Sequence, residues 1–165
     1  MSRAFVKDDA PSDEPLSERH VSEHPNKVTP AGLERLRTAA DELEAEQAEL
    51  SALPADDAMA RDRLRVVERD LRYYRDRVAT AIVVDQAGQP RDEVAFGATV
   101  AAREAGGELQ HITIVGEDEA DRETGTVSWV SPLGRVLTGA RVGDTVTWRR
   151  PAGDLELTVE AIEYS

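Results

Sequence analysis

The 165-residue sequence contains no cysteine, and aromatic side chains make up only 4% of it. The absence of cysteine excludes disulfides and thiolate metal sites. With so few aromatic residues there is no material for a large aromatic core. A structure held together by leucine and alanine, such as the seam between two helices, fits this composition better.

Long apolar segments are also missing from the sequence. No run approaches the ~20 apolar residues that span a bilayer. The first residues lack the apolar core of a secretory signal. We therefore expect a soluble protein located in the cytoplasm.

The sequence has few basic residues, 20 Lys and Arg against 33 Asp and Glu, which gives a net charge of −13. Electrostatic repulsion opposes duplex DNA or an anionic membrane as the main partner. A basic protein surface or a metal ion is a more natural target. We expect any contact with nucleic acid to be indirect, and no contact with membranes.

Residues 29–84 are predicted to form an antiparallel pair of helices. Apolar residues recur there in steps of three and four, in two segments separated by residues 53–57, which is typical of a coiled-coil seam. Thr29 and Pro30 predict the first helix start, and Pro54 ends that helix near Ala52. The predicted seam comprises Leu33, Leu36, Ala40, Leu43 and Leu50 on helix one and Leu64, Val67, Leu71, Tyr74, Val78 and Ala81 on helix two.

Charge favours the same pairing, since the first helix is rich in glutamate and the second in arginine. An arm of about 22 residues would be roughly 33 Å long. The alternative is that both helices belong to a compact bundle, although no third amphipathic helix is present to complete it.

Residues 1–28 combine acidic residues with three prolines and show no apolar period. This composition predicts a flexible acidic arm. His20 and His24 are four residues apart and would form half a metal site on a helix, but Pro25 disfavours that helix and no third ligand is in view.

Residues 85–165 alternate with a period of two and contain short apolar runs, which indicates a β-rich domain. The fold class expected for the whole chain is α+β, with a helical coiled-coil hairpin followed by a small sheet curled around one short helix. Five strands are predicted at residues 94–100, 111–115, 126–130, 145–148 and 155–159, and the helix at residues 133–137.

Several segments of this domain resemble, in order, the C-terminal domain of the GreA/GreB transcript cleavage factors. They are Phe-Gly-Ala-Thr-Val at 96–100, Ile-Val-Gly-Glu-Asp-Glu-Ala-Asp at 114–121, Ser-Pro-Leu at 131–133, Val-Gly-Asp at 142–144, Pro-Ala-Gly-Asp at 151–154 and Val-Glu-Ala-Ile-Glu-Tyr at 159–164. Residues 28–36 are similar to the start of the family's first coiled-coil helix.

The resemblance implies an FKBP-like C-terminal domain that docks on bacterial RNA polymerase at the rim of its secondary channel. It also implies a coiled coil that enters the channel, where an acidic pair at the tip helps to hold the second Mg²⁺ ion of the polymerase. Two metals stabilise phosphodiester hydrolysis, and carboxylates suit magnesium. Such a protein is a monomeric accessory factor, with no catalytic residue and no cofactor of its own.

The predicted tip departs from the family pattern. The family's Asp and Glu, three residues apart in a motif containing Gly and Asn, have no counterpart, and the first helix is several turns shorter. The adjacent pair Asp56 and Asp57 remains. This pair either caps the second helix or acts as metal ligands inside the polymerase, and adjacent residues diverge by about 100° on a helix.

The resemblance also supplies candidate polymerase-docking residues in the C-terminal domain. A solvated turn is an alternative for the acidic run, and an N-cap for the serine. Trp129 and Trp148 are either core residues or docking anchors. The docking candidates are Glu117, Asp118, Glu119, Asp121, Ser131, Pro132 and Leu133.

Three hypotheses follow from these observations. The leading one is a Gre-type regulator that inserts its arm into the secondary channel and modulates transcription, with or without stimulating RNA cleavage. The second is a protein-interaction module of the same fold that binds polymerase or another partner without cleavage activity. The third is a peptidyl-prolyl isomerase, suggested only by the FKBP-like fold, which does not by itself confer that activity.

Overall fold

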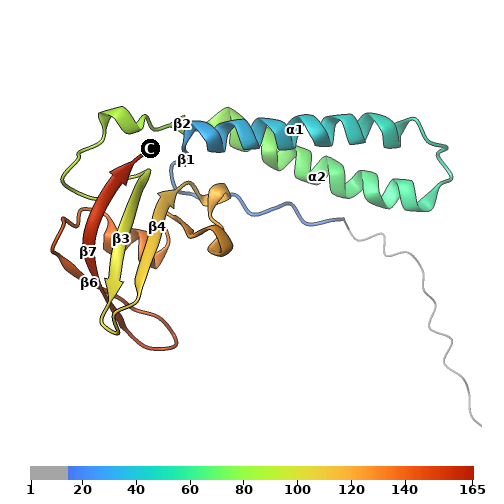
Figure 1. The fold of residues 1–165 in the computed structure, drawn as a ribbon. Coiled ribbons are helices and arrows are strands. Elements are labelled where there is room, and N and C mark those ends of the chain that lie inside the picture. The colour runs from blue at the N-terminus through green and yellow to red at the C-terminus, as the bar shows by residue number, and fades with distance from the viewer. Residues whose placement is uncertain (1–14) are drawn as a thin grey trace, which may run out of the picture.

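The structure is a computed structural model that describes residues 15–165. Its dominant feature is a hairpin of two helices, α1 (Pro30–Ser51) and α2 (Ala58–Thr80), which projects away from a small β domain (Figure 1). The Thr29 side chain accepts a hydrogen bond from the Gly32 backbone N–H, so the predicted cap and start of α1 are confirmed. The helix ends at Ser51, three residues before Pro54.

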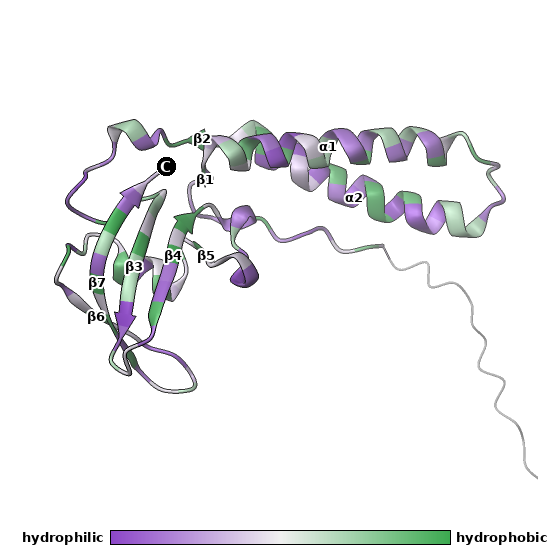
Figure 2. Ribbon diagram, viewed as in Figure 1, coloured by the Kyte–Doolittle hydropathy of each residue, from purple (hydrophilic) through white to green (hydrophobic). Residues whose placement is uncertain are grey.

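The seam between the two helices follows the predicted spacing. Leu36 and Ala40 of α1 and Val67 and Leu71 of α2 are buried. The other predicted seam residues are half-buried, and polar residues cover the outer faces (Figure 2). Ion pairs join acidic α1 to basic α2, with Arg63–Glu46 at 2.6 Å and Arg75–Glu44 at 2.7 Å. The structure therefore confirms the paired helices, and their projection from the sheet excludes the compact bundle.

The β domain contains a five-stranded mixed sheet in the order β5-β4-β3-β7-β6. β5 is parallel to β4, and the remaining neighbours are antiparallel. The strands are β3 (Ala98–Glu104), β4 (Leu109–Val115), β5 (Thr126–Ser128), β6 (Thr145–Trp148) and β7 (Leu155–Tyr164).

Several strand boundaries differ from the prediction, and two of these differences have a clear physical reason. The first strand begins at Ala98 rather than residue 94, because Gly97 has a φ of 88° and breaks the extended chain. The last strand continues to Tyr164, which pairs with Ala98 across the sheet. Pairing with the whole length of β3 thus extends β7 beyond its apolar run.

The core lies between the sheet and the short helix α3 (Pro132–Leu137). Leu133 and Leu137 pack there with Val100, Ile114 and Leu157. A five-stranded sheet around one helix, preceded by a helical hairpin, confirms the predicted α+β fold class.

The hairpin and the sheet meet at a two-stranded parallel ladder, β1 (Lys27–Val28) with β2 (Ile82–Val83). Three short 3₁₀ turns lie nearby, η1 (Gln86–Gly88), η2 (Glu117–Glu119) and η3 (Arg122–Thr124). The chain therefore enters and leaves the hairpin at one point. From there the two helices project side by side, away from the sheet (Figure 1).

The predicted flexible arm, residues 1–28, is only partly covered by the structure, because residues 1–14 lie outside the described residues. Residues 15–28 run along the underside of α2 to the sheet domain (Figure 1). They make side-chain contacts that the composition did not suggest. Among residues 15–165, no helix is both long and apolar enough to cross a membrane.

Candidate functional site: the hairpin tip and its base

The far end of the hairpin is a short exposed loop between α1 and α2, and it carries the two predicted aspartates. Asp57 is the N-cap of α2, and its Oδ1 accepts a hydrogen bond of 3.0 Å from the Ala60 backbone N–H. Asp56 precedes the cap and is exposed. The capping interpretation thus holds for Asp57, while Asp56 is not the cap residue.

Apolar side chains flank the two aspartates. Leu53 is 47% exposed on one side of the loop and Met59 is 84% exposed on the other. The tip thus combines negative charge with exposed apolar surface. In the described part of the chain, no group of three or more His, Asp or Glu is placed to hold a metal ion. The tip aspartates fit a divalent cation only as additional ligands to a site that a partner completes.

The opposite end of the hairpin is held by a buried carboxylate. Glu119, in η2, is only 6% exposed and lies at the start of α1. Its Oε2 accepts hydrogen bonds of 3.1 Å from the backbone N–H groups of Thr29 and Gly116, and the Thr29 hydroxyl donates to Oε1. A negative group at a helix N-terminus is favoured by the unpaired N–H groups and the helix dipole.

Gly32 explains how the carboxylate fits against α1. A Cβ at this position would collide with the Glu119 carboxylate carbon. The glycine therefore serves close packing between the helix and η2, and any larger residue would push the two apart.

A second buried charge fixes α2 to the same turn. Arg77 is 2% exposed, and its Nε donates a hydrogen bond of 2.7 Å to Asp118 Oδ2. Tyr73, one helical turn earlier, donates its hydroxyl to Asp118 Oδ1. Burial, and then the hydrogen bond to Asp118, raise the pKa of Tyr73 to about 12. η2 is thus joined to both helices, through Glu119 to α1 and through Asp118 to α2.

These contacts give the predicted docking residues 117–119 a structural role that sequence reasoning missed. The carboxylates of Glu119 and Asp118 both bond to the hairpin base. The solvated-turn interpretation is wrong for Glu119, which is buried, whereas Asp118 remains an exposed residue of the turn. Arg77 looked like one of seven arginines on the second helix. Nothing in the local sequence distinguishes it from the exposed ones, because its partner is 41 residues away.

The remaining docking candidates lie on the sheet domain. The Asp121 side chain caps η3, and Ser131 caps α3 as its alternative interpretation proposed. Leu133 is a core residue at 5% exposure, whereas Pro132 is exposed. A docking role for this set stays a prediction.

The structure also places the two tryptophans and the two histidines that the sequence analysis singled out. Trp129 and Trp148 are both half-buried and pack against the core. His20 and His24 do not lie on a helix, and the His24 ring instead forms a T-shaped pair with the Trp129 ring, with centroids 6.0 Å apart.

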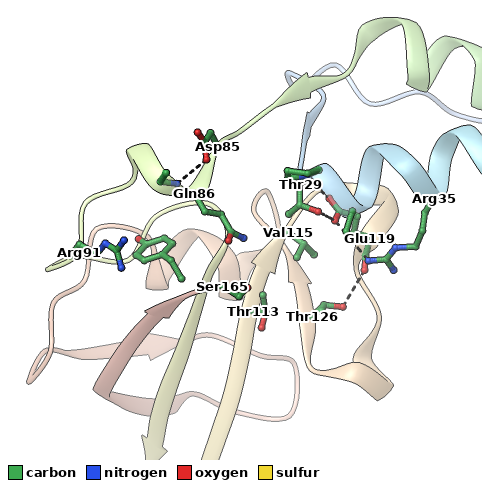
Figure 3. Close-up of a pocket in the computed structure, with 14 residues that line it drawn as sticks. Thr29, Arg35, Asp85, Gln86, Arg91, Thr113, Val115, Glu119, Thr126 and Ser165 are labelled. Atoms are coloured by element: carbon green, nitrogen blue, oxygen red, sulfur yellow. Dashed lines mark hydrogen bonds and ion pairs between the residues drawn. The ribbon is translucent and has the colours of Figure 1, made fainter.

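A cavity of about 620 Å³ lies beside the hairpin base (Figure 3). It is bounded by the start of α1, residues 85–91 and the ends of β4 and β7. Its walls include Arg35 and Arg91 on opposite sides, with Gln86 and Thr113 between them. Arg35 is already 4.0 Å from Glu119. The one hydroxyl–carboxylate pair among the lining residues, Thr29 with Glu119, is buried and engaged in bonds to backbone N–H groups at the start of α1. The cavity thus supports no catalytic assignment.

Comparison with known proteins locates the β domain in one family. The family model "Transcription elongation factor, GreA/GreB, C-term" matches residues 89–164. Transcription elongation factor GreB of Neisseria meningitidis serogroup A is 40% identical over 103 residues, which is 62% of this chain and 63% of the relative. Transcription elongation factor GreA of Trichlorobacter lovleyi is 39% identical over 107 residues, 64% of this chain and 67% of the relative.

Solved structures that are similar to this chain were also found. The GreA/GreB factor of Nitrosomonas europaea is 24% identical with a TM-score of 0.42, covering 84% of this chain and 98% of that chain. GreA factor homolog 1 of Thermus thermophilus is 24% identical with a TM-score of 0.40, covering 85% and 99%. Both TM-scores are below 0.5, so the fold described above stands on the chain's own elements.

Proposed function

The chain belongs to the GreA/GreB family, and from this premise we propose that it is a regulator that binds RNA polymerase and inserts its hairpin into the secondary channel. The matched region spans 63% of the length of the Neisseria relative, and the relatives' printed names describe transcription elongation factors. In this proposal the sheet domain docks at the channel rim, and the hairpin carries Asp56 toward the active centre.

One observation supports the proposal above all others. The hairpin is fastened to the sheet domain at one end by buried charges and is fully exposed at the other end, where its aspartates lie. A rigid base and a free acidic tip suit an element that reaches into a confined space. A helix of 22 residues is about 33 Å long, so the tip lies well away from the sheet domain.

The proposed chemistry places the reaction in the polymerase. Hydrolysis of a phosphodiester through two metal ions needs hard oxygen ligands for each ion. Asp56, with Asp57 beside it, would add carboxylate oxygens to a Mg²⁺ ion that the polymerase already contacts. This chain would then supply no nucleophile, no general base and no cofactor of its own.

A second candidate function is favoured by the capping bond at Asp57. Asp57 Oδ1 accepts a hydrogen bond from the Ala60 N–H, so one oxygen of this carboxylate is already used at the start of α2. A tip with one free carboxylate would occupy the channel and obstruct it without stimulating cleavage. The two candidates share the docking step and differ only in the effect of the tip.

Binding is tested by a pull-down of the full chain with purified core polymerase, followed by competition with an authentic Gre factor. We expect binding that the Gre factor displaces. The absence of binding, or binding that a large excess of Gre factor leaves intact, would remove the channel from the proposal.

The effect of the tip is tested on stalled, backtracked elongation complexes. The Asp56→Ala, Asp57→Ala double variant should bind polymerase as tightly as the parent. If the parent stimulates RNA cleavage, the double variant should lose that stimulation. Asp62→Ala is a matched control, because it removes a carboxylate from the exposed side of α2 and leaves the tip intact. Cleavage at the parental rate in the double variant would exclude the two aspartates from the mechanism.

A further inference from the structure

The segment before the hairpin, residues 15–28, contacts both parts of the molecule. We call it the N-terminal strap. It lies outside residues 89–164, which the family model matches. From β1 at the hairpin base it runs back along α2 in the direction of the tip (Figure 1).

At the sheet domain the strap is held by close packing and by Trp129. The Lys27 ammonium lies 4.6 Å from the centre of the Trp129 ring, which is a cation–π contact. The Lys27 carbonyl oxygen would be 2.5 Å from a Cβ at Gly116, so the strap crosses η2 with no space to spare. Val28 is 1% exposed.

At the hairpin base the strap is tied to the end of α2. Asn26 is 5% exposed, and its Nδ2 donates hydrogen bonds of 2.7 Å to the Arg77 carbonyl and 3.2 Å to the Thr80 hydroxyl. The inner half of the strap is therefore anchored on both parts.

The outer half of the strap reaches further along α2. The Arg19 guanidinium lies 3.9 Å from the centre of the Tyr73 ring and 3.9 Å from Asp70. Glu18 receives two hydrogen bonds from Arg72, the shorter being 2.5 Å. Asp70 and Thr80 are ten positions apart on α2, so the strap follows the helix for about 15 Å.

We propose that residues 15–22 position the hairpin, by bracing α2 at Asp70, Arg72 and Tyr73 and so narrowing the range of directions in which the tip points. The hairpin leaves the sheet domain at one point, and a rod held only at its base swings most at its far end. A brace higher on α2, continuous with a segment packed against Trp129, opposes that swing. For the function proposed above, which this inference deepens, the brace would align the tip with a narrow channel.

The direction of the hairpin can be measured without polymerase. The chain has no cysteine, so two spin labels can be attached at single introduced cysteines. Met59→Cys near the tip and Val142→Cys on the sheet domain are suitable, since both side chains are largely exposed, at 84% and 58%. Pulsed electron paramagnetic resonance then gives the distribution of distances between tip and sheet domain.

The test compares the doubly labelled parent with the Glu18→Ala, Arg19→Ala double variant in the full chain. Glu23→Ala is the matched control, because it removes an exposed carboxylate from the same strap. We expect a broader or shifted distance distribution in the double variant and the parental distribution in the control. Arg72→Ala, which breaks the Glu18 contact from the α2 side, should broaden it as well.

Identical distributions in the parent, the double variant and Arg72→Ala would overturn the inference. Circular dichroism on the same samples separates loss of the brace from loss of fold, because unfolding lowers the helical signal and a swinging hairpin does not. Failure of the proposed function looks different again. A chain that does not bind polymerase would still show a narrow distribution that the strap substitutions broaden.

If the chain binds polymerase, the double variant should bind more weakly than Glu23→Ala, because a hairpin with a wider range of directions loses more freedom when it enters a channel. Equal affinities, together with a broadened distribution, would show that hairpin direction is irrelevant to docking and would remove the alignment role.

Discussion

The two ends of the hairpin are built on opposite principles. All the buried polar and charged residues in the described part of the chain lie at the base: Asn26, Thr29, Arg77 and Glu119. Residues 51–59, which form the tip, are all exposed. Buried hydrogen-bonded charges fix one arrangement, because each of their partners would be left unsatisfied in any other. The comparison shows where the molecule is rigid and where it is available to a partner.

We expect the largest loss of stability from a substitution at Arg77, in the hairpin base. The Arg77→Ala substitution removes one member of a buried ion pair and leaves Asp118 without its guanidinium. We expect a loss of about 3–5 kcal/mol in the free energy of unfolding, measured by urea denaturation. Arg75→Ala, which removes an exposed arginine paired with Glu44, should cost less than about 1 kcal/mol. Similar losses in both variants would mean that the base is no more constrained than the helix surface.

The second-largest loss of stability is expected at Glu119, which joins α1 to η2. Glu119→Ala leaves two buried backbone N–H groups, those of Thr29 and Gly116, without an acceptor. The expected loss is about 3 kcal/mol in urea denaturation. Glu123→Ala, on the neighbouring exposed turn, is the control and should change stability by about 0.5 kcal/mol or less.

Gly32→Ala addresses the same contact from the side of the helix. Alanine is the better helix former, so in an isolated helix this change would stabilise α1. Here the added methyl group collides with Glu119, and we expect a net loss of about 1–3 kcal/mol. A stabilised protein in the same denaturation experiment would contradict the close packing of α1 on η2.

Substitutions at the tip should change the free energy of unfolding far less than substitutions at the base. Asp57→Ala removes the N-cap of α2 and should cost about 1 kcal/mol, while Asp56→Ala should leave the free energy of unfolding nearly unchanged. Denaturation of the two single variants side by side measures the difference. A larger effect for Asp56 than for Asp57 would reverse the roles assigned to the two carboxylates.

The smallest effect is confined to alkaline pH. The pKa of Tyr73 is raised to about 12, whereas tyrosine ordinarily titrates near 10. Because the folded-state pKa is the higher one, this stabilising contribution is complete below about pH 10 and is lost as the pH rises toward about 12. Tyr73→Phe should therefore flatten the decline of the urea midpoint over this interval. An unchanged decline would show that Tyr73 titrates normally.

The tip and the helix ends could be predicted from the sequence because their contacts are local. Thr29, Asp57 and Ser131 each cap a helix through a backbone N–H three residues ahead. Such bonds depend on residue type and short spacing alone. The seam was predictable for the same reason, since a spacing of three and four residues is a property of a single helix.

The base could not be predicted, because its contacts join residues far apart in the chain. Thr29 and Glu119 are separated by 90 residues. The acidic run containing Glu119 has the composition of a solvated turn, and only the folded chain places it against the start of α1. Residues 15–28 have the composition of a flexible arm, and their contacts with α2 and Trp129 likewise depend on tertiary structure.

The sequence by itself determined two helices with a shared seam, a small β domain after them and a carboxylate at the turn between the helices. These features follow from periodicity, capping and charge, which act over a few residues. Only the tertiary structure decided how the hairpin is held. A carboxylate such as that of Glu119 joins two parts of the molecule only when the fold brings hydrogen-bond donors from distant residues to it. The direction in which the hairpin points is a property of those distant contacts.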